Sequence, residues 1–326
     1  MKNVCVVGYG AIGPVHAKAL EIVDNAALYG ICDINQDRLN KSLKDYPDIK
    51  LYSDFDEMLH DENIDAVHIC APHYLHYEMI KKALAAEKAI IAEKPAVMTK
   101  EEFKKLQALN GIENVCFVLQ NRLNPCVKYL KDLIQGGSMG KIKAIRGTLF
   151  WNRTKEYYMS DAWRGKWATE GGGVLINQAI HTLDLMRYFA GNIKSVSANM
   201  YNYSLQNVIE VEDTFSAYAE FENGINGVFF ATNAYAANVD PEIEVIFDKG
   251  SACYIYGNIL LNGKFVCSDS KPVDNRKEYW GSGHEMLIKN FYDNHLYFNI
   301  NDIKNSMETV FAMYESAKAS GTKIFV

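Results

Sequence analysis

The sequence predicts two domains of different class. Residues 1–121 are expected to form an α/β domain with a doubly wound parallel sheet, and residues 122–326 an α+β domain with a large, mostly antiparallel open sheet. In the first part, short apolar runs alternate with helical stretches, which is the βαβ pattern of a parallel sheet. In the second part, longer runs alternate apolar and polar residues, as expected of antiparallel strands. A length of 326 residues is sufficient for two domains of ordinary size.

The first domain is expected to contain six strands with helices between them. Apolar runs predict strands at residues 4–7, 28–32, 51–52, 65–71, 89–92 and 115–119. Helical stretches are expected at residues 13–22, 36–44, 55–59, 74–86 and 100–109. Asp54 stands directly before the third helix and is its expected N-cap.

The second domain is expected to begin near residues 120–125. A helix at 125–135 ends at Gly136-Gly137, and a second helix at 174–189 follows Gly171-Gly172-Gly173. Strands are expected at 141–151, 195–203, 213–221, 225–233, 242–247 and 252–256. Asn223-Gly224 is a hairpin signal between two of these strands. The last helix is expected at 303–319, and whether it packs back on the first domain is left open.

Composition excludes several classes of protein. Hydrophobic residues make up 48% and charged residues 23%, as in globular proteins. The net charge of -6 and the lack of a basic run argue against a nucleic-acid partner. The seven cysteines form no C-x-x-C pair, so neither a disulfide framework nor a zinc site is expected. No apolar run reaches membrane length, and the N-terminus enters a strand pattern directly, which predicts a cytoplasmic protein.

A dinucleotide fingerprint follows the first expected strand. Gly8-Tyr9-Gly10-Ala11-Ile12-Gly13 has the pattern G-x-G-x-x-G and opens a helix within a βαβ unit. The first glycine permits the tight turn, the second lets the backbone approach a pyrophosphate, and the third allows close packing of helix on strand. The start of the helix offers N–H groups to the phosphates. This context predicts a Rossmann-type cofactor site rather than an ordinary glycine-rich turn.

An acidic residue completes the fingerprint. Asp33 lies 20 residues after Gly13, at the end of the second strand, where a carboxylate accepts the ribose hydroxyls of NAD. A 2′-phosphate would meet a carboxylate there, so NAD is favoured over NADP. Arg38 is nearby but lies in the following helix.

Several motifs together resemble the Gfo/Idh/MocA family, which is named for glucose–fructose oxidoreductase, inositol dehydrogenase and a rhizopine-catabolism protein. The resemblance covers essentially the whole chain. In chain order the motifs are Ala71-Pro72-His73-Tyr74-Leu75-His76, Glu93-Lys94-Pro95, Gln120-Asn121-Arg122, Trp163-Arg164-Gly165, the run from Gly171 to Asp184, Glu212-Asp213-Thr214 and Tyr314-Glu315-Ser316-Ala317.

The resemblance implies an enzyme that moves a hydride between a nicotinamide cofactor and a hydroxyl of a sugar, a sugar derivative or a polyol. It also implies a homodimer or homotetramer that assembles through the face of the open sheet. Together with the fingerprint, it gives these expected cofactor-binding residues: Gly8, Tyr9, Gly10, Ala11, Ile12, Gly13, Asp33, Ile34, Arg38, Ala71, Pro72, His73, His76, Glu93, Lys94, Gln120, Trp163 and Arg164.

Lys94 and His181 are the expected catalytic residues. Lys94 follows the fifth strand at its carboxyl end, where such sheets bind ligands, and its ammonium could stabilise a developing alkoxide. Pro95 stiffens the loop that presents it. His181 is the candidate base because its ordinary pKa is near neutrality, and the resemblance places a catalytic histidine here. Asn177 and Asp184 are expected near the same helical face as His181.

Asn177 departs from the aspartate that many dehydrogenases of this family carry. An amide can bond a substrate hydroxyl, but it would not stabilise protonated His181 as a carboxylate would. The departure argues against an inositol-dehydrogenase type more than against redox chemistry, since some nucleotide-sugar oxidising members share an asparagine here. Asp184 is expected either to orient His181 or to belong to a buried network, and both alternatives stay open.

The substrate site is expected to be aromatic and polar. The segment Trp151 to Tyr158 has aromatic faces with polar tips, which suit sugar rings, although a loop or subunit contact explains it nearly as well. Arginines could receive a carboxylate or phosphate. The expected substrate-binding residues are Asn177, Gln120, Arg122, Tyr157, Arg164 and Asp184. The remaining histidines have no metal-ligand spacing, so His16, His60, His68, His284 and His295 are interpreted as structural or surface residues and no metal site is expected.

Two rival functions remain. One is an enzyme that uses tightly bound NAD as a recycled catalyst, with transient oxidation followed by elimination or hydrolysis. The other is a non-catalytic sensor of a sugar or dinucleotide, against which the presence of both Lys94 and His181 argues.

Overall fold

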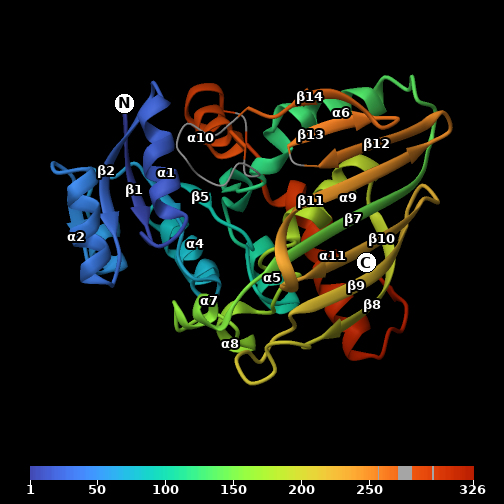
Figure 1. Cartoon of the computed structure of the whole chain (residues 1–326). Coiled ribbons are helices and arrows are strands. Elements are labelled where there is room, and N and C mark those ends of the chain that lie inside the picture. The colour runs from blue at the N-terminus through green and yellow to red at the C-terminus, as the bar shows by residue number, and fades with distance from the viewer. Residues whose placement is uncertain (256, 271–280, 296) are drawn as a thin grey trace. The chain divides into compact units, whose positions relative to one another are not determined.

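The computed structural model describes residues 1–255, 257–270, 281–295 and 297–326 (Figure 1). The chain forms two compact units. The first unit contains Met1–Gln120 and His284–Ile303, and the second contains Asn121–Gly283 and Lys304–Val326. Each unit has its own sheet, and the two are described in turn.

The first unit is built on a parallel sheet. Its described strands are β1 (Lys2–Val7), β2 (Ala26–Cys32), β3 (Lys50–Tyr52), β4 (Ala66–Ile69), β5 (Ala89–Ala92) and β6 (Cys116–Phe117). They lie in the order β3-β2-β1-β4-β5-β6, and every neighbouring pair is parallel. This is the doubly wound order of a Rossmann domain, so the predicted fold class of this part is confirmed.

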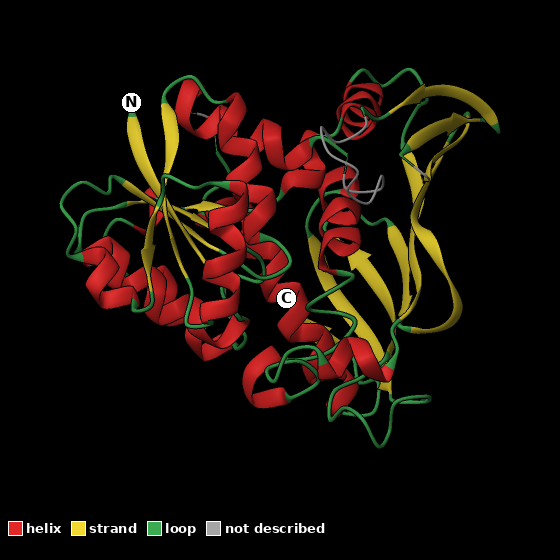
Figure 2. Ribbon diagram, turned by 60° about the vertical axis from the view of Figure 1, so that its left-hand side comes forward, coloured by secondary structure: helices red, strands yellow, loops and turns green. Residues whose placement is uncertain are grey.

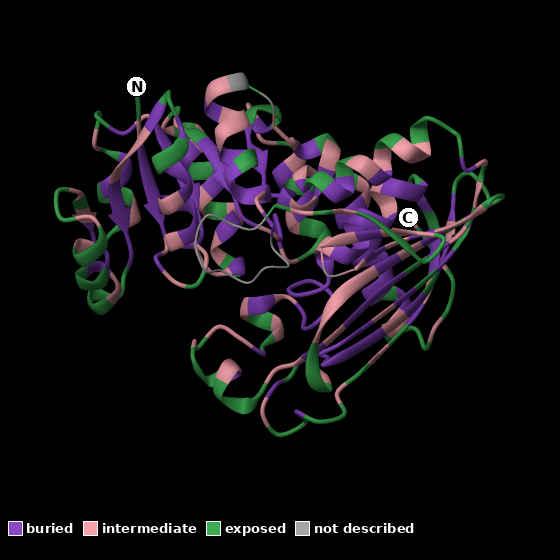
Figure 3. Ribbon diagram, turned by 45° about the horizontal axis from the view of Figure 1, so that its top comes forward, coloured by how far each residue is buried: buried purple, intermediate pink, exposed green. Residues whose placement is uncertain are grey.

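The α-helices of the first unit are α1 (Gly13–Ala19), α2 (Gln36–Asp45), α3 (Phe55–Leu59), α4 (His76–Ala85), α5 (Lys100–Gln107) and α10 (Gly283–Asn294) (Figure 2). Short 3₁₀ turns occur at Leu20–Ile22, His73–Leu75, Ile112–Asn114 and Gln120–Leu123. Asp54 accepts a hydrogen bond from the Glu57 amide, as expected of an N-cap. Most strand residues of this sheet are buried (Figure 3), in agreement with the apolar runs of β1 and β4.

The second unit carries a larger sheet. In the part of the chain that the structure describes, its strands are β7 (Ile142–Asn152), β8 (Ile193–Tyr201), β9 (Thr214–Phe221), β10 (Asn226–Thr232), β11 (Ala234–Phe247), β12 (Gly250–Ile255), β13 (Asn258–Leu261), β14 (Lys264–Ser268) and β15 (Ile324–Phe325). Their order is β14-β13-β12-β11-β7-β10-β9-β8-β15. All neighbouring pairs are antiparallel except β10 and β7, so a large, mostly antiparallel sheet is confirmed.

The second unit also contains helices. They are α6 (Pro125–Gln135), α7 (Lys155–Met159), α8 (Trp167–Glu170), α9 (Ile180–Ala190) and α11 (Ile300–Lys318), whose first residues belong to the first unit. Of these, α6 and α9 pack on this sheet. Helix α9 lies so close to β7 that a Cβ at Gly147 would be 2.4 Å from the Met186 sulfur. The small residue at 147 therefore sets the approach of the helix that carries His181.

Several expected elements differ from the structure. The helix expected to start at residue 174 begins at Ile180, so Asn177 precedes it and the helical spacing from Asn177 to His181 does not apply. Strand β11 begins at Ala234 rather than at residue 242, and the hairpin β13–β14 and helix α10 were not predicted. Residue 256, the expected end of one strand, lies outside the described residues.

Candidate active site

The glycine-rich turn between β1 and α1 has three sterically different glycines. Gly8 has φ +91°, and a Cβ there would lie 2.6 Å from the Cys70 carbonyl oxygen. A Cβ at Gly13 would lie 2.1 Å from the Gly8 carbonyl oxygen. A Cβ at Gly10 would meet only the Arg38 side chain, at 3.6 Å. The protein itself therefore requires glycine at positions 8 and 13, whereas position 10 leaves room for a ligand to approach the backbone.

Asp33 is held at the end of β2 by backbone groups. Its Oδ2 accepts the Tyr9 amide at 2.7 Å, and its Oδ1 accepts the Asn35 amide at 2.8 Å. The Arg38 Nη1 lies 3.8 Å from Asp33 Oδ2. Each carboxylate oxygen can accept a second hydrogen bond, so a fixed acceptor stands beside the turn, as a dinucleotide ribose requires. These residues fit NAD.

The expected nicotinamide-side residues follow β4. Ala71 and Pro72 are half-buried, while His73 and His76 are buried. The His76 ring joins two loops, because Nε2 lies 2.8 Å from the Ala71 carbonyl oxygen and Nδ1 lies 2.7 Å from the Pro95 carbonyl oxygen. Burial lowers the pKa of His76, although both carbonyl contacts oppose that shift. The ring thus links the loop after β4 to the loop that carries Lys94.

Lys94 follows β5 by two residues and is half-buried. Its backbone N–H donates to Glu93 Oε2 at 3.1 Å, and Glu93 is 5% exposed. The loop is therefore fixed on both sides of Lys94, by the Glu93 carboxylate before it and by the bond from His76 to Pro95 after it. Gln120, at the end of the first unit, is buried in a 3₁₀ turn.

His181 lies in the first turn of α9 and is partly exposed. Asn177 lies before this helix, is 8% exposed, and donates from Nδ2 to the buried Glu170 carboxylate. The other Glu170 oxygen accepts the Gly165 amide. A buried carboxylate therefore stands behind Asn177, although Asn177 itself has no charge.

Glu212 explains why α9 starts late. Its carboxylate accepts the amides of Gly173 at 2.9 Å and Leu175 at 3.1 Å and the hydroxyl of Tyr314 at 2.9 Å. Its backbone carbonyl accepts the Val174 amide at 3.2 Å. These bonds hold residues 173–175 in a turn. Burial raises the pKa of Glu212 to about 7, although the hydrogen bonds it accepts act against the shift.

Asp184 and Arg122 form a buried two-point ion pair. Arg122 Nε and Nη2 donate to Asp184 Oδ2 and Oδ1 at 2.8 and 2.6 Å, and each residue is at most 3% exposed. The Ser306 hydroxyl also donates to Asp184, at 2.6 Å. Burial alone would raise the pKa of Asp184, but the charges of Arg122 and Arg187 and the hydrogen bonds from Arg122 and Ser306 together outweigh it, and the pKa is lowered. Asp184 therefore belongs to a buried network, which is one of the two alternatives expected for it, and a role in orienting His181 stays a prediction.

An aromatic and polar cluster surrounds Tyr157. Arg164 lies over the Tyr157 ring at 4.4 Å and over the Trp163 ring at 4.7 Å. Its guanidinium and the Gln178 amide both donate to the Tyr157 hydroxyl. The Asn233 amide donates to Gln178 Oε1 at 2.9 Å and to the Tyr158 hydroxyl at 3.0 Å. The structure thus brings Tyr157, Trp163 and Arg164 together.

Sequence reasoning missed three residues of this region, namely Glu170, Gln178 and Asn233. Gln178 follows Asn177 directly, so its place in the same motif was a usable signal. Asn233 comes immediately after β10, and nothing in its surroundings marks it. Ile34, an expected cofactor contact, is 90% exposed directly after Asp33, and its role stays a prediction.

The glycine-rich turn and the fixed Asp33 fit a dinucleotide-binding Rossmann domain. Sequence comparison then shows the class of this protein, an NAD-binding oxidoreductase, and its family. Residues 2–120 match the family model described as "Oxidoreductase family, NAD-binding Rossmann fold", and residues 127–253 match "GFO/IDH/MocA C-terminal domain". The chain belongs to the Gfo/Idh/MocA family, as predicted.

Relatives in this family differ in their cofactor. The chain is 31% identical to scyllo-inositol 2-dehydrogenase (NAD(+)) of Bacillus subtilis, over 76% of this chain and 71% of that one. It is 28% identical to scyllo-inositol 2-dehydrogenase (NADP(+)) IolW of the same organism, over 61% and 54%. Among solved structures, the WlbA dehydrogenase of Bordetella pertussis in complex with NADH and UDP-GlcNAcA matches with a TM-score of 0.88 at 26% identity, covering 100% of this chain and 97% of that one.

In the described residues, no helix combines the length and apolar character needed to cross a membrane.

Proposed function

We propose that this protein is an NAD-dependent dehydrogenase that oxidises a hydroxyl of a sugar or sugar derivative. The observation that carries the proposal is the turn at Gly8–Gly13 with the fixed Asp33 carboxylate beside it. Family membership supports the reaction class. The substrate class is supported by the polar and aromatic cluster around Tyr157 and by the sugar and polyol substrates of the relatives.

NAD rather than NADP is the proposed cofactor. Asp33 is fixed by two backbone amides and is 6% exposed, so it cannot turn away from a 2′-phosphate at low cost. Arg38 is close enough to partly offset the repulsion, because its Nη1 is 3.8 Å from Asp33 Oδ2. We expect this offset to be incomplete, since the guanidinium already pairs with the carboxylate.

Lys94 and His181 are the proposed catalytic residues. Bound NAD supplies the hydride acceptor. The Lys94 ammonium hydrogen-bonds the reacting hydroxyl and stabilises the negative charge that develops on its oxygen. His181 accepts the hydroxyl proton as a general base. The hydrogen bonds on both sides of Lys94 restrict the loop that carries it. The loop therefore loses less conformational entropy when the substrate binds.

Asn177 is proposed to bind a substrate hydroxyl. Its Nδ2 must face Glu170, because a carboxylate accepts hydrogen bonds and cannot donate them. The amide orientation is therefore fixed, and Oδ1 points the other way as an acceptor. Arg122 is proposed to be structural, since its Nε and Nη2 both donate to the buried Asp184 carboxylate.

A sugar linked to a nucleotide is the first substrate to test. The solved WlbA dehydrogenase contains UDP-GlcNAcA, and it matches this chain along its whole length. Asn177, in place of the more usual aspartate, also favours a nucleotide-linked sugar, because some nucleotide-sugar oxidising members of the family share an asparagine here. We propose that Arg164, which stacks on two aromatic rings and also pairs with Asp161 at 3.3 Å, binds an anionic group of such a substrate.

The proposal is tested by incubating the full-length protein with NAD and either UDP-GlcNAcA, scyllo-inositol or myo-inositol, while NADH absorbance is recorded. Stoichiometric NADH formation with any of these substrates supports a dehydrogenase. Product formation without free NADH would instead support the recycled-cofactor alternative. NADH binding without turnover on a broad panel of sugars and polyols would contradict the proposal and favour a sensor.

A further inference from the structure

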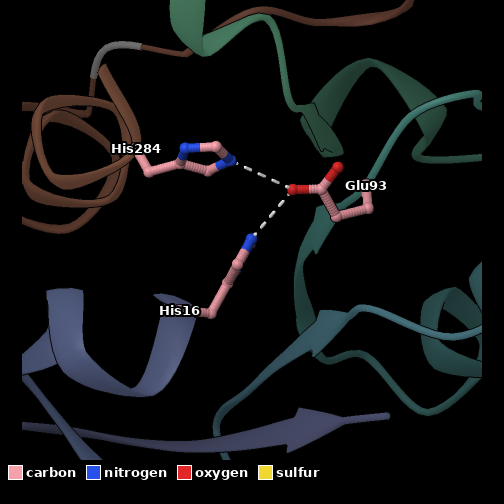
Figure 4. A group of neighbouring side chains, drawn as sticks. All are labelled: His16, Glu93 and His284. Carbon is pink, nitrogen blue, oxygen red and sulfur yellow. Dashed lines mark hydrogen bonds and ion pairs between the residues drawn. The ribbon is translucent and has the colours of Figure 1, made fainter. Parts of the chain in front are cut away.

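Two histidines and a glutamate converge in the interior of the first unit (Figure 4). His16 lies on α1, Glu93 follows β5, and His284 lies near the start of α10. The Nε2 atoms of His16 and His284 lie 3.1 and 3.4 Å from the same atom, Glu93 Oε1. We propose that His16, Glu93 and His284 form a binding site for a divalent transition-metal ion, with zinc as the first candidate. This proposal does not depend on the proposed function.

The donor set suits such an ion. Two imidazoles and one carboxylate are a known combination at zinc sites that keep an open coordination position. In a tetrahedral zinc site with bonds near 2.0–2.1 Å, neighbouring ligand atoms lie about 3.3 Å apart. The two distances to Glu93 Oε1 are already close to this value, and all three ligand atoms lie within 4.8 Å of one another. Small side-chain movements would therefore complete the three-ligand site.

The burial of the three residues and the negative charge of Glu93 also favour a bound cation. The exposed fractions are 0% for His16, 5% for Glu93 and 3% for His284. An ionised carboxylate in such surroundings needs a strong positive partner. In the described part of the chain, the Glu93 side chain contacts the imidazoles of His16 and His284 and the Lys94 amide. A zinc ion with Glu93 and one bound hydroxide would leave the site electrically neutral.

A second layer of hydrogen bonds could orient the first ligand. His16 Nδ1 lies 3.1 Å from His68 Nδ1, and His68 Nε2 lies 2.8 Å from the Tyr292 hydroxyl. With neutral rings and a metal on His16 Nε2, the His16 Nδ1–H donates to His68, and the His68 Nε2–H donates to Tyr292. Metal-binding histidines commonly donate their second N–H in this way, which fixes the ring orientation.

This cluster could not be predicted from the sequence, because its three residues are far apart in the chain. Metal spacing is a local signal, and it detects pairs on one helix or in one loop. Here the ligands come from two helices and a strand end that only the fold brings together.

The experiment uses the full-length chain, purified without an affinity tag or chelator. Metal content is measured by mass spectrometry, and metal-free protein is then titrated with Zn²⁺ and with Co²⁺, whose visible absorption reports tetrahedral coordination. We expect about one zinc per chain and a tetrahedral cobalt spectrum that zinc abolishes. Failure of the wild-type protein to retain or bind either ion at micromolar concentration would overturn the proposal and leave a hydrogen-bonded cluster.

Variants locate the ion. His284→Gln and Glu93→Gln should each weaken Co²⁺ binding at least tenfold, whereas His60→Gln is a matched control because His60 is exposed on the surface. Circular dichroism checks that each variant is folded. Unchanged metal binding in both site variants would overturn the proposal, since the ion would then lie elsewhere. If one variant does not fold, the other variant and the wild-type cobalt spectrum still decide.

Discussion

Gly10 and Gly13 lie in the same turn but differ in what a methyl group would meet. A Cβ at Gly13 would lie 2.1 Å from a backbone oxygen, whereas a Cβ at Gly10 would contact only the flexible Arg38 side chain at 3.6 Å. We expect Gly13→Ala to lower the free energy of unfolding by about 3 kcal/mol or more. Gly10→Ala should change it by less than about 0.5 kcal/mol but weaken NADH binding at least tenfold.

Urea unfolding and NADH fluorescence titration measure the two effects separately. Wild-type NADH affinity in Gly10→Ala would show that no ligand approaches the backbone at this position. A Gly13→Ala protein as stable as wild type would show that the helix can move away from the turn.

Asp33 makes the cofactor preference testable at a single residue. We expect wild-type protein to bind NAD more tightly than NADP, because a 2′-phosphate would meet the fixed carboxylate. Asp33→Ala should weaken NAD binding and reduce the preference at least tenfold. Asp37→Ala is the matched control, since Asp37 is exposed on α2. Tighter binding of NADP by the wild-type protein, in titrations of both cofactors, would refute the assignment.

At the scale of elements, Glu212 connects the turn before α9 to α11. Its pKa is about 7 in the folded protein because of burial, against an ordinary glutamate value near 4.3 in the unfolded chain. Below pH 4 both states are protonated. Between these two values the unfolded chain ionises first, so stability falls as pH rises, and above about pH 7 the loss is complete.

We therefore expect the free energy of unfolding to fall between pH 4.5 and pH 7.5 by about 3 kcal/mol more in wild type than in Glu212→Gln. Urea titrations at several pH values measure this difference, and groups common to both proteins cancel. Parallel pH dependences of the two proteins would mean that Glu212 is ionised at low pH in the folded state.

The sequence predicted elements well where local pattern decides them. The buried strand β5 was placed at its observed bounds, and Asp54 was recognised as a cap, because apolar runs and N-caps are local signals. Residues 174–179 were predicted as the start of a helix because they follow the glycine-rich run Gly171-Gly172-Gly173. Glu212 lies more than 30 residues away in the chain, and its bonds to Gly173 and Leu175 hold this segment in a turn, which no local pattern could reveal.

In the candidate site, too, the residues within one local motif could be predicted from the sequence, whereas those that depend on tertiary contacts could not. The glycine-rich turn and Asp33 were found from spacing, since they lie within one βαβ unit. The support of Asn177 by Glu170, and of Gln178 by Asn233, depends on segments that only tertiary structure brings together. The pairing of Arg122 with Asp184 is equally non-local.

At the scale of the whole molecule, the outer face of the large sheet is the remaining surface to explain. In register across four strands, Tyr218, Val228, Arg146 and Glu244 form one row, and Tyr218 and Val228 are 45% and 52% exposed. Ile246 on the same strand as Glu244 is also exposed. We propose that this face joins subunits of a homodimer or homotetramer, because exposed apolar sheet faces commonly mark interfaces.

Light scattering at micromolar concentration should give a dimer or tetramer, and Val228→Asp with Tyr218→Asp should shift it toward monomer. Glu222→Ala is the control, since Glu222 lies in a turn outside this row. A monomeric wild-type protein would remove the assignment.

The central claim, that Lys94 and His181 carry the chemistry, is tested most directly by the single-turnover rate of NADH formation, once a substrate is found. His181→Ala should slow hydride transfer by roughly 10²–10⁴-fold, and Lys94→Ala at least as much. Both variants should still bind NAD, and the double variant should lose less than the product of the single losses. A wild-type rate in His181→Ala would contradict the account and place the base elsewhere, with Tyr157 and Tyr158 as the next candidates.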